Sequence, residues 1–449
     1  MTGITSLFNN NSKTIKQILL VFLVVFHFTM FYSLRNEPVQ LRDSEEYIHS
    51  AENYYIYGNF YAGIHNAETD YRLFSKRTPL YPLILVSFKA LNIHPNYIYI
   101  VQTFLGLLNI FLALVLLRML LPSKRASYIL LGVFILLTPS QFIYSQFIMA
   151  DLWLQTLVMV LMVSLARYLE TNNKKWILTC IITGTLCALI KPVFLPASFI
   201  IGLIGLFIFL KEKIYFFTLI TLIPFFSWYM LSSKNEKLTG VFHYSSIGSM
   251  NLLHYNTNLY LNKAIGQAET EKLLGPLMIV PYSKAEFKQN YQAINTVCRK
   301  ALITHFAGYS FYHLKGSVLF FLDPGRFDLY SFFKIEQEDS AGFLHKGAAT
   351  SKLEDMLSKH PTLFLVLILV FLINVIKTIG FIGFIWQNRQ RKLVWIGAAM
   401  VFYFALITGP LGASRFALPV VLIMMCYAVG FYSGFFGLQK SEKKAKGIE

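Results

Sequence analysis

Long runs of apolar residues, each bounded by short polar segments, constrain the fold of this chain more than any other feature. Examples lie at residues 18–33, 199–210 and 363–375. A helix of about 20 apolar residues crosses the roughly 30 Å hydrocarbon core of a bilayer, because each residue adds about 1.5 Å. Only 14% of the 449 residues are charged, whereas soluble proteins have about 25%. The sequence therefore predicts an all-α polytopic membrane protein and excludes a soluble domain.

The positions of the basic residues indicate how these helices are oriented. Lys and Arg gather in short gaps between the apolar runs, whereas most acidic residues fall in two longer polar stretches, at 35–96 and 232–360. Short cytoplasmic loops carry an excess of Lys and Arg, so we attribute the net charge of +17 to topology rather than to nucleic-acid binding. We expect about ten transmembrane helices, both termini in the cytoplasm and both polar stretches outside. The expected spans are residues 17–34, 97–121, 126–144, 150–168, 176–191, 193–210, 214–231, 361–386, 393–411 and 415–436.

Two apolar segments leave part of this topology open. Residues 79–91 make a helix of about 20 Å, too short to span, so we expect a short interfacial helix that begins at Thr78 and Pro79. Residues 311–322 are interrupted by polar side chains, and we expect them outside as well. A spanning role remains the alternative for both segments. Lys377, midway along a predicted span, is expected to face the bundle interior.

The polar stretches divide the chain into three parts. Residues 1–231 are expected to form an N-terminal transmembrane module with the external loop 35–96, residues 232–360 a small external helical region, and residues 361–449 the C-terminal transmembrane helices with a basic cytoplasmic tail. The four cysteines lack the spacing of zinc ligands, and no Walker or GxGxxG loop is present. We therefore expect no cofactor and no metal site. A divalent metal stays open, but nothing in the sequence indicates one.

The first external stretch contains the amphipathic segment LRDSEEYIHSAENYYIYG, residues 41–58. Asp43 and Glu46 have the spacing of a capping box, aromatic residues follow at helical intervals, and Gly58 is a natural helix stop. The pattern predicts a helix lying at the membrane surface just after the first span. On spacing alone, Asp43 either only caps this helix or is a catalytic carboxylate.

Several short motifs then follow in a fixed order along most of the chain. They are Arg77-Thr-Pro-Leu-Tyr-Pro-Leu83, Thr138-Pro139 followed by Ala150-Asp151, Leu189-Ile-Lys-Pro192, and Ser414-Arg-Phe-Ala-Leu-Pro419. Together with the acidic segment after the first span, this order resembles the GT-C glycosyltransferases. These are integral-membrane enzymes that include protein O-mannosyltransferases and the lipid A aminoarabinose transferase. The chain departs from the family pattern in having Ala150-Asp151 where a Ser-Glu pair is usual, and in its short second external region.

The resemblance implies an inverting glycosyltransferase that takes its sugar from a polyprenyl-phosphate carrier. The site candidates it implies are Asp43 as general base, Arg77, Lys191 and Arg415 as ligands of the donor phosphate, and Glu46 and Asp151 as further site residues. In the ten-span scheme all of them fall on external loops or at the external ends of spans, where charged groups commonly mark a site. For Asp151, Lys191 and Arg415, a structural ion pair is the alternative.

We therefore expect a hexosyl- or pentosyltransferase, active at the external face of the cytoplasmic (inner) membrane of a bacterium. Its partners would be a polyprenyl-phosphate sugar donor and a glycan, lipid or protein acceptor, and no nucleic acid. Two alternatives remain: a transporter or flippase for lipid-linked sugars, and a polysaccharide polymerase or ligase. The dissimilar halves of the chain argue against the first, and the early position of the acidic loop argues against the second.

Overall fold

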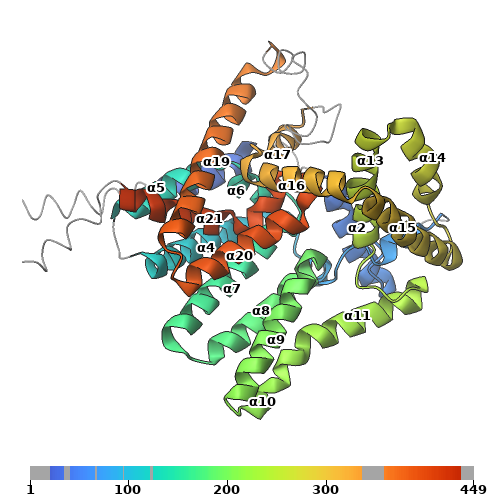
Figure 1. Ribbon diagram of the computed structural model, residues 1–449, viewed down its shortest axis with the longest axis horizontal. Coiled ribbons are helices and arrows are strands. Elements are labelled where there is room, and N and C mark those ends of the chain that lie inside the picture. Colours follow the sequence, from blue (N-terminus) through green and yellow to red (C-terminus); the bar gives the residue numbers. More distant parts are fainter. Residues whose placement is uncertain are drawn as a thin grey trace, which may run out of the picture.

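The computed structural model describes residues 21–34, 41–65, 68–94, 96–121, 125–335 and 358–435. Every regular element in these ranges is helical, and no strand occurs among them. Figure 1 shows a bundle built mainly from α4 to α9 and α19 to α21, with α13 to α15 projecting from one side of it. The predicted all-α polytopic membrane fold is therefore confirmed.

The helix bounds follow the apolar pattern of the sequence closely. After a first helix at Val21–Leu34, the α-helices are α2 (Arg42–Tyr57), α3 (Leu80–Ala90), α4 (Tyr97–Leu120), α5 (Arg125–Leu136), α6 (Ser140–Ile143), α7 (Asp151–Thr171), α8 (Lys175–Ile190), α9 (Leu195–Lys211), α10 (Tyr215–Thr218), α11 (Ile223–Thr239), α12 (Ile247–Asn251), α13 (Leu259–Ala264), α14 (Gln267–Met278), α15 (Lys284–Thr304), α16 (Phe306–Leu322), α17 (Arg326–Phe332), α19 (Pro361–Gln387), α20 (Lys392–Ile407) and α21 (Ser414–Phe435). A π-helical segment at Leu252–Asn258 joins α12 to α13, and a 3₁₀ turn at Gly409–Leu411 separates α20 from α21.

Six of the described helices are long and apolar enough to cross a membrane. A seventh span is possible if Ser127–Leu136 and Ser140–Gln146, which meet at a 71° bend, form one broken span. The remaining predicted spans coincide with the shorter apolar helices Val21–Leu34, Lys175–Ile190 and Lys392–Ile407. Each of the predicted spans thus falls on a helix or on the bent pair.

Helix α21 is the centre of the bundle. The membrane-spanning part of α21 is 83% buried, against 17% to 56% for the other five long spans. The helix packs against α19, α7, α4 and α20. Gly380 of α19 permits one close approach, because a Cβ there would come within 2.8 Å of Ala428 on α21. Helix α21, which carries Arg415 in its first turn, is therefore enclosed by surrounding helices along most of its length.

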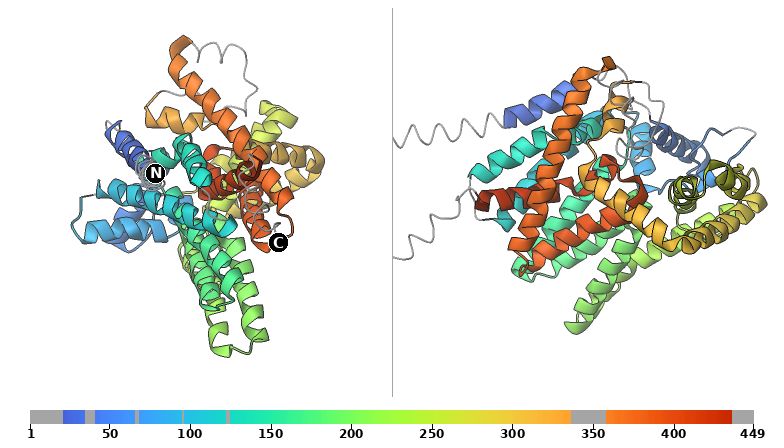
Figure 2. Two further views of the ribbon diagram at one scale, coloured as in Figure 1. Left: turned by 90° about the vertical axis from the view of Figure 1, so that its left-hand side faces the viewer. Right: turned by 45° about the horizontal axis from the view of Figure 1, so that its top comes forward.

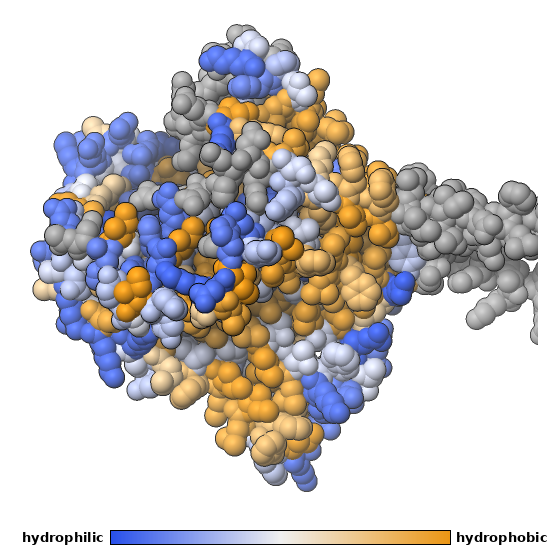
Figure 3. Space-filling view, turned by 180° about the vertical axis from the view of Figure 1, so that it is seen from behind, coloured by the Kyte–Doolittle hydropathy of each residue, from blue (hydrophilic) through white to orange (hydrophobic). Residues whose placement is uncertain are grey.

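The outer helices present the surface expected toward lipid. Phe207 is 69% exposed on α9 although the segment is strongly apolar, and Figure 2 shows α8, α9 and α11 as a layer beside the central helices. Figure 3 shows hydrophobic residues spread over the bundle, while hydrophilic residues gather at the side that carries α13 to α15. This distribution is that of a protein with its bundle in a bilayer and one end in water.

The two ends of the bundle differ in their charges. At one end, Arg391 before α20 donates hydrogen bonds to the carbonyls of Leu120 and Met119 at the end of α4, and Lys174 pairs with Glu212 at 2.9 Å. The opposite end, where α7 and α21 begin and α8 ends, carries Asp151, Arg415 and Lys191. We call it the site end.

The short helix α3 lies at the site end. The Tyr81 hydroxyl at its start donates to Gln102 Oε1 in the first turns of α4, at 3.1 Å, so α3 and α4 begin at the same end of the bundle. The helix begins slightly later than expected, at Leu80, and Thr78 does not cap it. The Thr78 hydroxyl instead donates to the carbonyl of Ile190, which ties the residue after Arg77 to the end of α8.

Helix α16 contacts the site end both in its middle and just after its last turn. His313 in its middle contacts the carbonyl of Leu406 at the end of α20, at 2.7 Å. Asp323, just after its last turn, accepts a hydrogen bond from the backbone of Ser414 at the start of α21. Both partners lie at the same end of the bundle, so α16 does not cross it.

Candidate active site

Helix α2 carries the acidic groups of the site on one face. Asp43, Glu46 and Tyr47 are spaced three and four residues apart, which places them on the same side of a helix. Of the two alternatives for Asp43, the one in which it only caps this helix is wrong. The helix begins at Arg42 with Leu41 as N-cap, and Ser44 Oγ accepts the hydrogen bond of the Leu41 N–H at 3.3 Å. Asp43 lies two residues after the N-cap, in the first turn of the helix, and its carboxylate is available for other contacts.

Arg77 joins the two carboxylates of α2. Its Nη2 lies 2.5 Å from Asp43 Oδ1 and 2.6 Å from Glu46 Oε2, and its guanidinium carbon lies 4.7 Å from the centroid of the Tyr47 ring. The guanidinium is therefore fixed by two ion pairs and an aromatic face. Glu46 does not serve as the expected capping partner, because both of its oxygens pair with cations.

Lys76 is a member of the site that the sequence analysis missed. Its Nζ lies 2.5 Å from Glu46 Oε1, and both side chains are only 8% exposed. Burial lowers the pKa of Lys76 from its ordinary value, although the Glu46 carboxylate opposes the shift. The signal was present in the sequence, since Lys76 directly precedes Arg77. Adjacency alone, however, does not predict that two side chains enter the same site.

Arg415 connects α2 to the transmembrane bundle. Its Nη2 lies 2.6 Å from Asp43 Oδ2, so Asp43 is held between two guanidinium groups. The same side chain lies 3.4 Å from Asp151 Oδ1. Asp151, the first residue of α7, is only 1% exposed, and its Oδ1 also pairs with Lys191 Nζ at 2.6 Å. All six residues expected in the site therefore lie in one continuous network.

We call this network the ion-pair cluster. Its members are Asp43, Glu46, Lys76, Arg77, Asp151, Lys191 and Arg415. Four cations face three carboxylates, so the cluster carries one positive charge in excess. An excess cationic charge in a largely buried site favours an anionic ligand such as a phosphate.

Exposure differs sharply within the cluster. The Asp43 side chain is 28% exposed and Arg415 is 18% exposed, whereas Glu46 is 8% and Asp151 1% exposed. Asp43 and Arg415 are therefore the members that a ligand from outside reaches first. Glu46 and Asp151 lie behind them and hold the cations in place.

The electrostatics of Asp43 are dominated by its two arginines. Burial would raise the pKa of the Asp43 carboxyl, but the guanidinium groups of Arg415 and Arg77 outweigh burial and hold that pKa well below its ordinary value. Asp43 is thus ionised at neutral pH. A carboxylate so strongly stabilised is a weak base until one of its cations moves away.

A loop of the region after α11 positions the segment that carries Arg77. Ser246 donates from its backbone N–H to the carbonyl of Ser75 and from its hydroxyl to the carbonyl of Arg72. The Ser245 hydroxyl donates to the carbonyl of Lys76 at 2.9 Å, and Ser75 Oγ lies 2.6 Å from a ring nitrogen of His243. None of these polar residues stood out in the sequence, because each acts through backbone that is distant along the chain.

No group of three or more His, Cys, Asp and Glu side chains suited to a metal ion occurs among the described residues. The carboxylate oxygens of Asp43 and Glu46 are already engaged by Arg and Lys. The donor set of the ion-pair cluster is mixed in charge, which suits an anion better than a divalent cation.

No family model and no curated protein matches this chain. Two solved structures of ArnT from Cupriavidus metallidurans are similar to it. The apo structure aligns with a TM-score of 0.39 and 12% identity over 94% of this chain and 77% of that chain. The structure bound to undecaprenyl phosphate aligns with a TM-score of 0.38 and 11% identity over 97% and 81%. Because these scores are low, a function has to be argued from the residues of this chain.

Proposed function

We propose that this protein is a glycosyltransferase that moves a sugar from a polyprenyl-phosphate-linked donor to the hydroxyl of a glycan, lipid or protein acceptor. The observation that carries the proposal is the position of Asp43, whose carboxylate is shared by Arg77 and Arg415. A potential base and potential phosphate ligands are thereby in direct contact. This is the arrangement that a transfer reaction away from a phosphate requires.

The position of the cluster in the bundle supports a lipid-linked donor. Arg415 and Asp151 begin two apolar spans, and Lys191 ends a third. A phosphate whose hydrocarbon tail lies in the bilayer would reach this depth, while its sugar would lie toward α2 and the aqueous side. Charges at helix ends also favour a transferase over a transporter, whose substrate site is expected near the bilayer midplane.

In the proposed reaction the donor phosphate binds the cations of the cluster and draws Arg415 away from Asp43. Arg415 is the shared cation, and its contacts to Asp151 are the longest in the cluster, at 3.4 Å. As the phosphate draws Arg415 away, the pKa of Asp43 rises toward its ordinary range, and its carboxylate becomes a better base. Donor binding thus activates the base, which limits reaction with water before the donor arrives.

The chemical step balances without a further reactant. Asp43 accepts the proton of the acceptor hydroxyl as the oxygen attacks the anomeric carbon from the face opposite the phosphate, with inversion. The bond between that carbon and the phosphate oxygen breaks, and its electrons stay with the leaving polyprenyl phosphate. Arg77, Lys191 and Arg415 stabilise the negative charge that builds on that oxygen. Glu46 and Asp151 keep these cations oriented.

The proposal includes a location and an organisation for the protein. The site end would face outward from the cytoplasmic membrane of a bacterium, both termini would be cytoplasmic, and the parts 1–231, 232–360 and 361–449 would be the catalytic module, the external cover and the C-terminal helices. The cationic end with Arg391 and Lys174 agrees with this orientation, because cytoplasmic loops are rich in basic residues.

A transfer assay on membranes tests the proposal. Membranes containing the wild-type protein are incubated with polyprenyl phosphates that carry radiolabelled mannose, glucose, galactose or aminoarabinose. We expect one donor to release polyprenyl phosphate and to label an acceptor, and the Asp43→Asn protein to do neither. Movement of an intact labelled lipid across sealed vesicles, without release of polyprenyl phosphate, would instead assign a flippase.

A further inference from the structure

Two buried carboxylates hold the first residue of α21. Asp323 Oδ2 accepts a hydrogen bond from the backbone N–H of Ser414 at 2.7 Å, and Asp328 Oδ2 accepts one from the Ser414 hydroxyl at 2.5 Å. Asp323 is 6% exposed and Asp328 2% exposed. Neither forms an ion pair with a Lys or Arg among the described residues, so the groups that donate hydrogen bonds to these two acids are neutral. We call Asp323, Asp328 and Ser414 the acid clamp.

The clamp is itself held by two further elements of the bundle. The Tyr144 hydroxyl, which follows α6, donates to Asp328 Oδ1 at 2.7 Å, and Asn374 of α19 donates to the backbone carbonyl of Asp323 at 2.8 Å. Between the two acids the chain turns at Gly325, which has φ +77°. A Cβ there would lie 3.0 Å from Ser414 Oγ. Both the backbone angle and the close approach therefore require glycine.

The clamp acts on the residue next to it in the chain. Arg415 follows Ser414, and both polar groups of Ser414 are occupied, so the backbone from which Arg415 extends cannot shift without breaking two hydrogen bonds to carboxylates. Such hydrogen bonds are about twice as strong as neutral ones. The Arg415 guanidinium must reach Asp43 at 2.6 Å and Asp151 at 3.4 Å from this backbone position.

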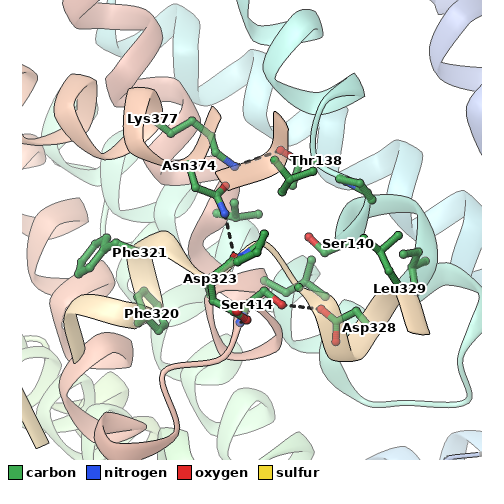
Figure 4. Close-up of a pocket in the computed structure, with 18 of the residues that line it drawn as sticks. Thr138, Ser140, Phe320, Phe321, Asp323, Asp328, Leu329, Asn374, Lys377 and Ser414 are labelled. Atoms are coloured by element: carbon green, nitrogen blue, oxygen red, sulfur yellow. Dashed lines mark hydrogen bonds between the residues drawn. The ribbon is translucent and has the colours of Figure 1, made fainter. Parts of the chain in front are cut away.

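A small cavity adjoins the clamp (Figure 4). Its volume is about 30 Å³, and it is lined by Asp323, Asp328, Thr138, Ser140 and Lys377 among others. Lys377 is buried, as expected, and its ammonium donates to Thr138 Oγ1 at 3.1 Å. Asp323 Oδ1 is buried and accepts no hydrogen bond within the described residues. Polar groups line part of the cavity, which has room for one or two water molecules.

We propose that the acid clamp is a positioning device for Arg415, and that water in the adjoining cavity links the clamp to Lys377. The water gives Asp323 Oδ1 the partner it lacks and gives the Lys377 ammonium further acceptors. The ammonium then offsets the charge that the clamp acids carry when they are ionised. This inference rests on the proposed role of Arg415 in binding the donor phosphate.

The test measures binding of undecaprenyl phosphate to the purified full-length protein in nanodiscs, with undecaprenol as the uncharged reference lipid. The variants are Ser414→Ala, Asp328→Asn, and each of these combined with Arg415→Ala. Ser433→Ala is the matched control, because Ser433 is another buried serine of α21, with its hydroxyl 2.9 Å from that of Ser127. It loses one hydroxyl hydrogen bond far from Arg415.

We expect Ser414→Ala to weaken undecaprenyl phosphate binding about tenfold, and Ser433→Ala to leave it unchanged, with similar melting temperatures for both. In the Arg415→Ala background, Ser414→Ala should add nothing, because its effect acts through Arg415. Equal losses in both backgrounds, or no loss in Ser414→Ala, would overturn the clamp. If Asp328→Asn fails to fold, the Ser414→Ala variant by itself still tests whether the acid clamp positions Arg415.

Failure of the proposed function gives a different result. Wild-type protein that binds undecaprenol as well as undecaprenyl phosphate has no phosphate site, and both proposals then fall. The water is tested separately by a cryo-EM map detailed enough to show ordered solvent. Density between Lys377 and Asp323 supports the link, and an empty cavity refutes it.

Discussion

The ion-pair cluster and the acid clamp are neighbours at the site end, yet they stabilise buried charge in opposite ways. In the cluster each carboxylate pairs with two cations, and Asp43 remains 28% exposed. In the clamp the carboxylates of Asp323 and Asp328 accept hydrogen bonds from neutral groups and are almost fully buried. A carboxylate in an ion pair can give up its cation to a charged ligand. The neutral donors of a buried hydrogen-bond network carry no charge that such a ligand would attract. The cluster is therefore suited to binding and the clamp to positioning.

The largest expected effect is that of removing the exchangeable carboxylate. Asp43→Asn keeps the size of the side chain but cannot accept a proton, so we expect turnover to fall by about 10² to 10⁴. The transfer assay measures it, with membrane insertion and melting temperature as controls for folding. Asp43→Glu should also be impaired, because its carboxylate is displaced. Near-normal turnover in Asp43→Asn would show that Asp43 is not the base, and the functional distinction between the ion-pair cluster and the acid clamp would then be lost.

The next effect concerns the two cations that pair with Asp151, one of which, Arg415, also pairs with Asp43. Arg415→Ala or Lys191→Ala removes a group that would stabilise charge on the leaving phosphate, and we expect turnover to fall by about a hundredfold or more. Lys174→Ala is the matched control, because Lys174 forms an ion pair at the opposite end of the bundle. If both site variants retain wild-type rates, these residues form structural ion pairs only.

A smaller effect should follow from weakening the ion pairs that hold two of the cations while leaving the cations in place. Glu46→Gln weakens the hold on Lys76 and Arg77, and we expect turnover to fall about tenfold, as for the loss of one charge-assisted hydrogen bond. Glu45→Gln on the exposed side of α2 is the control. An unchanged rate in Glu46→Gln would mean that Tyr47 and Asp43 alone suffice to orient Arg77.

The smallest effects are opposite dependences of stability on pH. Burial raises the pKa of Asp323 to about 7, so its native form retains a proton that the unfolded chain loses above pH 4. Stability from this group therefore falls as pH rises from about 4 to 7, by at most about 1.4 kcal/mol per pH unit. Asp43, with its pKa held low by Arg415 and Arg77, instead loses its stabilising contribution as pH falls below about 4.

Melting temperatures across pH 3 to 8 test this contrast. Asp323→Asn should flatten the decline between pH 4 and 7, and Asp43→Asn should flatten only the decline below pH 4. Asp328 and Lys377 line the same cavity as Asp323, so the Asp323→Asn curve is compared with that of Lys377→Met. An unaltered curve in Asp323→Asn would show that the clamp carboxyl is not perturbed.

Much of the fold could be predicted from local patterns. The spans follow from apolar runs, and Gly58 ends α2 with φ +70° as its sequence position suggested. Helix starts were less predictable. Asp43 matched the spacing of a cap, but its carboxylate pairs with Arg77 and Arg415 instead. Two ion pairs outweigh one cap hydrogen bond, and their partners lie far along the chain.

What the sequence determined by itself is the class of protein and the types of charged residue that collect at the ends of its spans. Hydrocarbon admits few charges, so apolar length and the placement of Lys, Arg, Asp and Glu are set residue by residue. Only the tertiary structure decided which charges meet. It brought Lys76 into the cluster, joined Asp43 to Arg415, and placed Asp323 and Asp328 on Ser414. Such contacts depend on how helices distant in sequence pack around α21, and no local pattern records that packing.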